Sequence, residues 1–192
     1  VPVLVDLKPS GAHYMEHFHH AGGVPKLLAQ LGELIDLDAG TVAGGTLRDI
    51  VAKAEDVPGQ DVIRPRSAPI MAEGSMAVLY GNLAPGGAII KQAAASARLL
   101  QHTGRAVVFE SVEDMAARID DPALDVGADD VLVLRNTGPK GAPGMPEAGY
   151  LPIPKKLGRQ GVKDMVRISD ARMSGTAFGT IVLHITPESA VG

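Results

Sequence analysis

Apolar residues beyond about residue 60 fall into short runs that are separated by loops rich in Gly and Pro. Short runs with many β-branched residues and with turn formers at both ends are typical of β-strands. The pattern predicts strands over Met76–Tyr80, Ala88–Ile90, Ala106–Phe109, Val131–Leu134, Val166–Ile168 and Ile181–Ile185. Helices are predicted to be few in this part; the clearest is Ser111–Ile119, where Ser111 and Asp114 resemble a capping box.

The first 60 residues show a different spacing. A short β-branched run predicts a strand over Val1–Val5. Between Tyr14 and Leu34 the apolar residues recur at helical intervals, and a Gly-Gly-x-Pro sequence divides them into two predicted helices. A third short helix is predicted over Thr46–Lys53, with Thr46 as its N-cap.

The polar stretch 56–68, which Pro interrupts, suits a linker and favours a domain boundary near residue 60. The chain is therefore predicted to be α/β. A mostly helical part covers residues 1–60, and a β-rich domain with flanking helices covers residues 61–192.

Composition narrows the classes of function. The chain has 192 residues, 45% of them hydrophobic, which is enough to bury a core. With 18 basic and 22 acidic residues in mixed order, we expect it to bind neither nucleic acid nor an anionic membrane. Because no apolar run approaches the roughly 18 residues that span a bilayer and no leader-like pattern opens the chain, we expect a cytoplasmic protein. Cysteine is absent, so this chain alone cannot supply thiolates for catalysis or for an iron–sulfur cluster. Because the first residue is not Met and the last ones interrupt a structured pattern, we expect a fragment of a longer protein.

Three short motifs have ordinary interpretations when each is taken alone. His13, Glu16 and His17 match the H-x-x-E-H pattern of a zinc protease, but no third ligand is evident nearby, which favours polar residues on a solvated helix. The glycines of 81–87 lack the Lys-Ser pair of a phosphate-binding loop and predict a turn. The segment 169–180 is typical of a polar turn between strands.

The connection 138–156 stands apart because it holds four Gly and five Pro in 19 residues, with Glu147 near its centre. Long connections without regular structure are usually functional or disordered.

Taken together, these stretches resemble one family across nearly the whole chain, the dihydroxy-acid and sugar-acid dehydratases. The resemblance lies in Leu7–Gly11, Ala21–Pro25, Gly81–Pro85, Gly138–Glu147, Ser169–Thr176 and Thr186–Glu188. It implies that residues 1 to about 60 end an N-terminal α/β domain and that the rest forms most of a C-terminal swivelling β-barrel domain. In this family an iron–sulfur cluster and a carbamylated lysine that helps bind Mg²⁺ lie in an N-terminal part that has no match here. That missing domain is an expected partner, a homo-oligomer is expected, and the isolated chain is expected to be inactive.

The resemblance also implies roles for three residues. Glu147 is similar to a Mg²⁺ ligand, and a hard cation does prefer carboxylate oxygen. Ser174 is similar to the catalytic base and Thr176 to its neighbour in the substrate pocket. Since a serine hydroxyl is a weak acid, its alkoxide needs metal charge and backbone N–H donors. The implied reaction removes the C2 proton and the C3 hydroxyl of a 2,3-dihydroxy acid and yields a 2-keto-3-deoxy acid.

The substrate class depends on the sequence around these residues. Branched-chain-pathway members tend to read Gly-Arg-Phe-Ser-Gly-Gly at the serine turn and more often carry Arg before the glutamate. This chain reads Ala-Arg-Met-Ser-Gly-Thr over 171–176 and Met-Pro-Glu over 145–147, which favours a small-molecule sugar acid such as a pentonate. Arg172 is not assigned to catalysis, because an ion pair with Asp170 explains it at least as well. Two alternatives remain: a branched dihydroxy acid as substrate, and a non-catalytic module whose Gly/Pro loop docks a partner.

Overall fold

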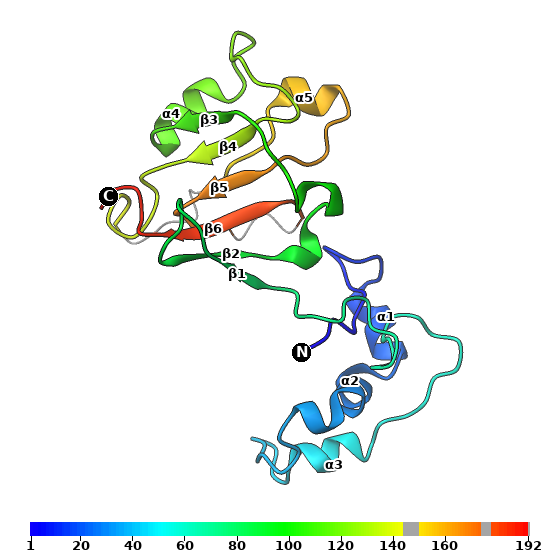
Figure 1. The fold of residues 1–192 in the computed structure, drawn as a ribbon. Helices are drawn as coiled ribbons and strands as arrows, with labels where there is room; N and C mark the ends of the chain where they lie inside the picture. The colour runs from blue at the N-terminus through cyan, green and yellow to red at the C-terminus, as the bar shows by residue number, and fades with distance from the viewer. Residues whose placement is uncertain (144–149, 174–177, 192) are drawn as a thin grey trace. The chain divides into compact units, whose positions relative to one another are not determined.

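The computed structural model describes residues 1–143, 150–173 and 178–191 (Figure 1). The chain divides into two compact units, Val1–Ser75 and Met76–Gly192, which we describe separately.

The second unit contains one six-stranded mixed sheet in the order β1-β2-β6-β5-β4-β3 (Figure 1). The strands are β1 (Ala77–Leu79), β2 (Gly87–Ile90), β3 (Ala106–Phe109), β4 (Val131–Leu134), β5 (Arg167–Ser169) and β6 (Ile181–Thr186). Strands β3, β4, β5 and β6 run parallel, whereas β2 pairs with β6 and with β1 in antiparallel fashion. All six strands predicted from the apolar runs are confirmed, and the α/β class with them.

One face of this sheet packs against helices α4 (Val112–Arg118) and α5 (Lys155–Arg159) to form the main core. Alternation along β4 shows which side is covered, because Leu132 and Leu134 are buried while Val131 and Val133 are half-buried. The predicted cap of α4 is confirmed: Ser111 Oγ accepts a hydrogen bond from the Asp114 backbone N–H at 3.2 Å. The connection from β2 to β3 contains the short 3-10 helices η2 (Gln92–Ala94) and η3 (Ala97–Leu99).

The first unit is mostly helical. It contains α1 (Met15–His20), α2 (Gly23–Leu31), the 3-10 turn η1 (Gly32–Leu34) and α3 (Leu47–Val51). The predicted division of the Tyr14–Leu34 stretch is confirmed, because Gly22 between the two helices and Gly23 at the start of α2 adopt left-handed φ angles of 105° and 57°. Thr46 is the N-cap residue of α3, as predicted, and its backbone N–H donates to Asp49 Oδ2 at 2.7 Å.

The strand predicted over Val1–Val5 is wrong. Only isolated bridges form there, between Val3 and Met71 and between Val5 and Ile63. The partner segment contains two Pro residues, which cannot donate to a ladder, so regular pairing cannot propagate along it.

The stretch 56–68 contributes to the core of the first unit. Val62 and Ile63 are 6% and 1% exposed and pack with Phe18 and Ala21. The domain boundary near residue 60 stays a prediction. The swivelling β-barrel also stays a prediction, because β1 and β3 stand at the two ends of the sheet order and are not paired with each other within the described residues. None of the described helices combines the length and apolar character that crossing a bilayer requires.

Candidate functional site

The predicted site residues belong to two loops that leave the same edge of the sheet. Strands β4 and β5 are parallel neighbours, with Leu134 opposite Ser169, so the segments that follow them start side by side. The loop after β4 carries Glu147, and the crossover after β5 carries Ser174 and Thr176. These three residues lie outside the described ranges. The geometry around them is therefore given by the described ends of the two loops.

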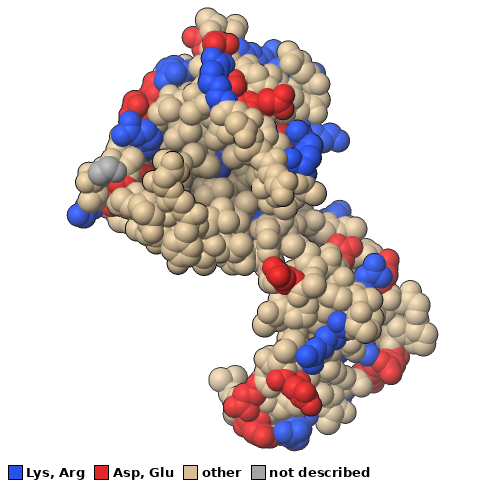
Figure 2. Space-filling view, viewed as in Figure 1, with Lys and Arg blue, Asp and Glu red and all other residues tan. Residues whose placement is uncertain are grey.

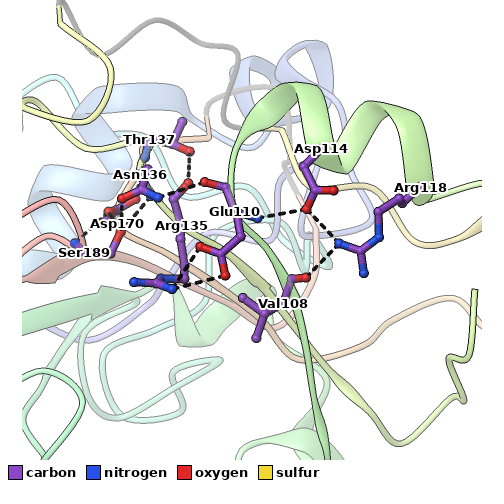
Figure 3. Close-up of polar contacts among 9 residues, drawn as sticks. All are labelled: Val108, Glu110, Asp114, Arg118, Arg135, Asn136, Thr137, Asp170 and Ser189. Carbon is purple, nitrogen blue, oxygen red and sulfur yellow. Dashed lines mark hydrogen bonds and ion pairs between the residues drawn. The ribbon is translucent and has the colours of Figure 1, made fainter.

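Asp170 joins the starts of the two loops, as Figure 3 shows. It follows β5 directly and is 5% exposed. Its Oδ1 accepts the backbone N–H of Thr137, the third residue after β4, at 3.0 Å. Its Oδ2 accepts the hydroxyl and the backbone N–H of Ser189 at 2.6 and 2.9 Å. Buried carboxylates need such donors, and these tie three segments together at one edge.

Glu188 holds the next residues of the loop after β4. Its Oε1 and Oε2 each lie 2.9 Å from the backbone nitrogen of Lys140, and Oε2 also accepts from the N–H of Gly141 at 3.3 Å. Two glycines make this approach possible. A Cβ at Gly138 would lie 2.3 Å from Glu188 Oε2, and one at Gly141 would lie 2.6 Å from the carbonyl carbon of Asn136. We refer to Asp170, Glu188 and Ser189 together as the carboxyl-edge anchor.

A third contact set extends this edge toward β3 (Figure 3). Asn136 has a left-handed φ of 56°, donates through Nδ2 to the Glu110 carbonyl at 2.9 Å and through its backbone N–H to Ser189 Oγ at 2.7 Å. Arg135 pairs with the Glu110 carboxylate at 2.9 Å on the surface. Asn tolerates the left-handed region better than most residues, which explains why it stands at this turn.

Two cavities adjoin the carboxyl-edge anchor. One of about 300 Å³ is lined by the apolar residues of β4 and β5 together with Arg135, Asp170 and Ser189. The other, of about 240 Å³, lies beside Asp170, His184 and Glu188. Cavities at the carboxyl edge of parallel strands are where ligands commonly bind in α/β folds.

Described residues next to the two gaps also meet. Leu151 is the second described residue after the first gap, and Met173 is the last one before the second gap. The backbone N–H of Leu151 donates to Met173 Sδ at 3.0 Å, and both side chains belong to the main core. Ser174 is next to Met173 in sequence, and Glu147 is four residues from Leu151, within about 14 Å along a fully extended chain.

Metal ligands are sparse in the described ranges, where no three His, Cys, Asp or Glu side chains gather as a metal site. In the H-x-x-E-H segment, His13 Nε2 lies 3.4 Å from Asp61 Oδ1 and 3.6 Å from Asp6 Oδ2, and His17 Nδ1 accepts the Tyr14 N–H at 3.3 Å. In the second unit, Figure 2 shows charged side chains of both signs mixed along the upper and lateral margins, whereas the centre of the visible face carries mainly uncharged residues.

Some of the carboxyl groups with shifted pKa values lie at the opposite edge of the sheet, where the parallel strands begin. The Arg105 guanidinium, just before β3, donates to Asp125 and Asp130 and thereby holds the pKa of each carboxyl below its usual value. Both pairs are at the surface, where such pairs contribute little to stability.

Sequence reasoning assigned no role to Glu188 or Ser189. The Thr186–Glu188 motif was the signal that could have identified Glu188, but its partner Lys140 is 48 positions away in the sequence. Asp170 was considered only as a partner of Arg172, whereas the structure shows its carboxylate bound to Thr137 and Ser189.

Comparison with known proteins gives two family matches. The model for the dihydroxy-acid/6-phosphogluconate dehydratase C-terminal region matches residues 61–192, and the model for the corresponding N-terminal region matches residues 1–50.

Relatives are similar over the whole chain. An L-arabonate dehydratase from Azospirillum brasilense is 55% identical, a 6-deoxy-6-sulfo-D-gluconate dehydratase from Pseudomonas putida 47%, and a dihydroxy-acid dehydratase from Synechococcus sp. (strain CC9605) 45%. In each case 100% of this chain is covered, but only 33% or 34% of the relative, so the chain spans about a third of their length.

Proposed function

The chain belongs to the dihydroxy-acid/6-phosphogluconate dehydratase family, and on that premise we propose that it forms part of a hydro-lyase acting on a sugar acid. The substrate would be a 2,3-dihydroxy aldonate and the product a 2-keto-3-deoxy acid. The observation that carries the proposal is that the loops of Glu147 and Ser174 start from neighbouring parallel strands and that their described ends meet at Leu151 and Met173. One substrate could therefore reach residues from both loops.

In this proposal Ser174 acts as the base. Its deprotonated oxygen takes the proton from C2, the C3–O bond breaks, and the hydroxyl leaves as water once it is protonated. The resulting enol tautomerises to the keto acid. Thr176, two residues on, would hold the substrate beside the base.

The residues of this chain could supply only some of the ligands of a metal site. Cysteine is absent, and the described residues hold no three-residue cluster of metal ligands. Glu147 would offer one carboxylate to Mg²⁺, which agrees with the preference of hard cations for oxygen. The remaining Mg²⁺ ligands and those of an iron–sulfur cluster would come from the rest of the parent protein. When bound, the two groups would supply Lewis acidity at the substrate oxygens, favouring loss of the C2 proton and the C3 hydroxyl.

A branched dihydroxy acid is the second candidate substrate, because a dihydroxy-acid dehydratase is 45% identical to this chain. The L-arabonate dehydratase at 55% and the Ala-Arg-Met-Ser-Gly-Thr sequence at 171–176 favour the sugar acid. Turnover of a pentonate and of 2,3-dihydroxyisovalerate by the same parent enzyme decides between them.

Ser174→Ala and Glu147→Gln in the parent enzyme test the proposal. We expect Ser174→Ala to keep the metal content but to lower kcat by about 10²- to 10⁴-fold, the usual contribution of a catalytic base. Glu147→Gln should lower both the Mg²⁺ content and the turnover. Matched controls are Ser67→Ala and Glu73→Gln, which change exposed residues of the first unit. Unchanged metal content and turnover in Glu147→Gln would favour a non-catalytic module instead.

A further inference from the structure

Asp164 is a buried carboxylate that the proposed reaction does not use. It precedes β5 and is 3% exposed. It accepts the hydroxyl and the backbone N–H of Ser96 at 2.7 and 3.3 Å. It also accepts the Thr180 hydroxyl at 2.7 Å and the Thr180 backbone N–H at 2.9 Å. Asp164 therefore fixes Thr180 at two points, just before β6 begins.

Arg167, the first residue of β5, lies beside Asp164 and is also 3% exposed. Its Nη2 is 3.4 Å from Asp164 Oδ1, and its Nη1 donates to the Leu151 carbonyl at 3.2 Å. Its backbone N–H donates to the Thr180 carbonyl at 3.0 Å. Its Nε is buried and has no hydrogen-bond partner within the described residues. We call Asp164 and Arg167 the buried pair.

Both groups are charged at neutral pH. Burial works to raise the pKa of Asp164, but the hydrogen bonds from Ser96 and Thr180 outweigh it, and the pKa lies below its ordinary value. Burial lowers the pKa of Arg167, against the opposing charge of Asp164, yet a guanidinium stays protonated in proteins.

The buried pair is poorly built for stability alone. Its single ion contact is long, and the Arg167 Nε donor is unpaired among the described residues. Replacing buried ion pairs by apolar side chains is often neutral or even stabilising, so stability gives little reason for such a pair. Its contacts instead go to Ser96, to Leu151 in the connection between β4 and α5, and to Thr180, which directly precedes β6.

From these contacts we propose that Asp164 and Arg167 are positioning residues of the proposed catalytic site. This proposal rests on the proposed function. Arg167 holds Leu151, which follows Glu147 by four residues, and Asp164 holds Thr180, which follows Thr176 by four residues. The buried pair thereby fixes the returning ends of the two loops relative to each other. In this proposal both residues act through the loop ends and not on the reacting atoms.

Gly179 gives the buried pair its space. A Cβ there would lie 2.0 Å from Arg167 Nη2 and 3.0 Å from Asp164 Oδ1, and the φ of 131° is one that side chains rarely adopt. Gly179→Ala is thus a variant that disturbs the pair without removing a charge.

The test uses the parent enzyme with Asp164→Asn and Arg167→Lys. Lys keeps the charge but lacks the planar fork that contacts Leu151 and Asp164 together. Thr180→Val, which removes one hydroxyl, serves if either variant fails to fold. Met115→Ala is the matched control. Met115 lies on α4 in the same core, and among the described residues it has no hydrogen bond to Leu151 or Thr180.

Four quantities are measured: kcat, KM, the Mg²⁺ concentration for half-maximal activity, and hydrogen exchange at the Leu151 and Thr180 amides. We expect the buried-pair variants to lower kcat about 100-fold, to raise the Mg²⁺ requirement, and to lose amide protection at both positions. Met115→Ala, compared at an equal fall in Tm, should keep kcat within about twofold. Equal effects of the control and of the buried-pair variants on kcat and on exchange would overturn the proposal.

The outcome can be separated from that of the proposed function. If Ser174→Ala and Glu147→Gln abolish turnover but Asp164→Asn does not, the positioning role alone fails. If Ser174→Ala and Glu147→Gln are fully active, the proposed function fails. Hydrogen exchange then decides whether the pair holds the loop ends: lost protection in Asp164→Asn supports it, and unchanged protection refutes it.

Discussion

The carboxyl-edge anchor and the buried pair both fix loop segments next to the sheet, but their surroundings differ. Each uses carboxylates to hold backbone N–H groups: Asp170 and Glu188 hold those of the loop after β4, and Asp164 holds that of Thr180 in the crossover after β5. At the carboxyl edge, Glu188 is only half-buried, so water can replace part of what a substitution removes. Around Asp164 no such replacement is available, because both it and Arg167 are 3% exposed.

Asp170 at the carboxyl edge is nearly as buried, at 5% exposed, but the groups of Thr137 and Ser189 that donate to it are neutral. Asp164, by contrast, balances the buried charge of Arg167. The energetic weight of a buried carboxylate here should therefore depend on whether it balances a buried charge.

The largest expected effect comes from breaking the buried pair. Asp164→Ala leaves the Arg167 charge buried without its partner, and such changes cost about 3–5 kcal/mol. Denaturant unfolding of the second unit should show this loss as a lower midpoint with an unchanged slope. A loss of less than about 1 kcal/mol would remove the distinction between the two regions.

Asp170→Ala should have a smaller effect. It leaves the Thr137 N–H and the Ser189 hydroxyl without their acceptor, at a cost of about 1–3 kcal/mol. The same unfolding measurement applies. A cost above that of Asp164→Ala would show that the carboxyl edge, and not the buried pair, dominates the stability of this unit.

Two glycine substitutions sharpen the comparison at the carboxyl edge. Gly141→Ala brings a Cβ to 2.6 Å from the Asn136 backbone, which has to move, whereas Gly138→Ala meets the Glu188 side chain, at 2.3 Å from Oε2 and 2.9 Å from Cβ. We expect Gly141→Ala to cost about 1–3 kcal/mol more, in the range of overpacked sites. Gly138→Ala should instead increase hydrogen exchange at the Lys140 amide, and we expect the same of Glu188→Gln, which weakens the same contact.

The smallest expected effect concerns pH. Since the pKa of Asp164 is lower in the folded state than its ordinary 3.8, its contribution to stability is present above that value. It is lost as the pH falls through the folded-state pKa, where the protonated carboxyl comes to resemble an amide. The difference in unfolding free energy between the wild type and Asp164→Asn should thus shrink below about pH 4. A difference that grows on acidification would contradict the assigned direction.

Local patterns predicted the elements of this fold well. The strands from β1 to β6 and the helix capped by Ser111 follow from runs of neighbouring residues, since apolar spacing and capping are local properties. The strand over Val1–Val5 failed because its pairing depends on a segment about 60 positions away that carries Pro.

The contacts that shape the candidate site are not local. Asp164 meets Ser96 across 68 positions, and Glu188 meets Lys140 across 48. No periodicity marks such residues, because each is a single polar side chain in an otherwise ordinary segment. Glu147, Ser174 and Thr176 were identified by resemblance to a family, and their roles stay predictions that the proposed substitutions test.

Gly179 has a consequence for protein engineering. Libraries that diversify the crossover after β5 to change substrate preference would naturally extend to position 179. Any side chain placed there collides with the guanidinium of Arg167, so inactive clones from that position would report on a displaced arginine and carry no information about the choice of sugar acid.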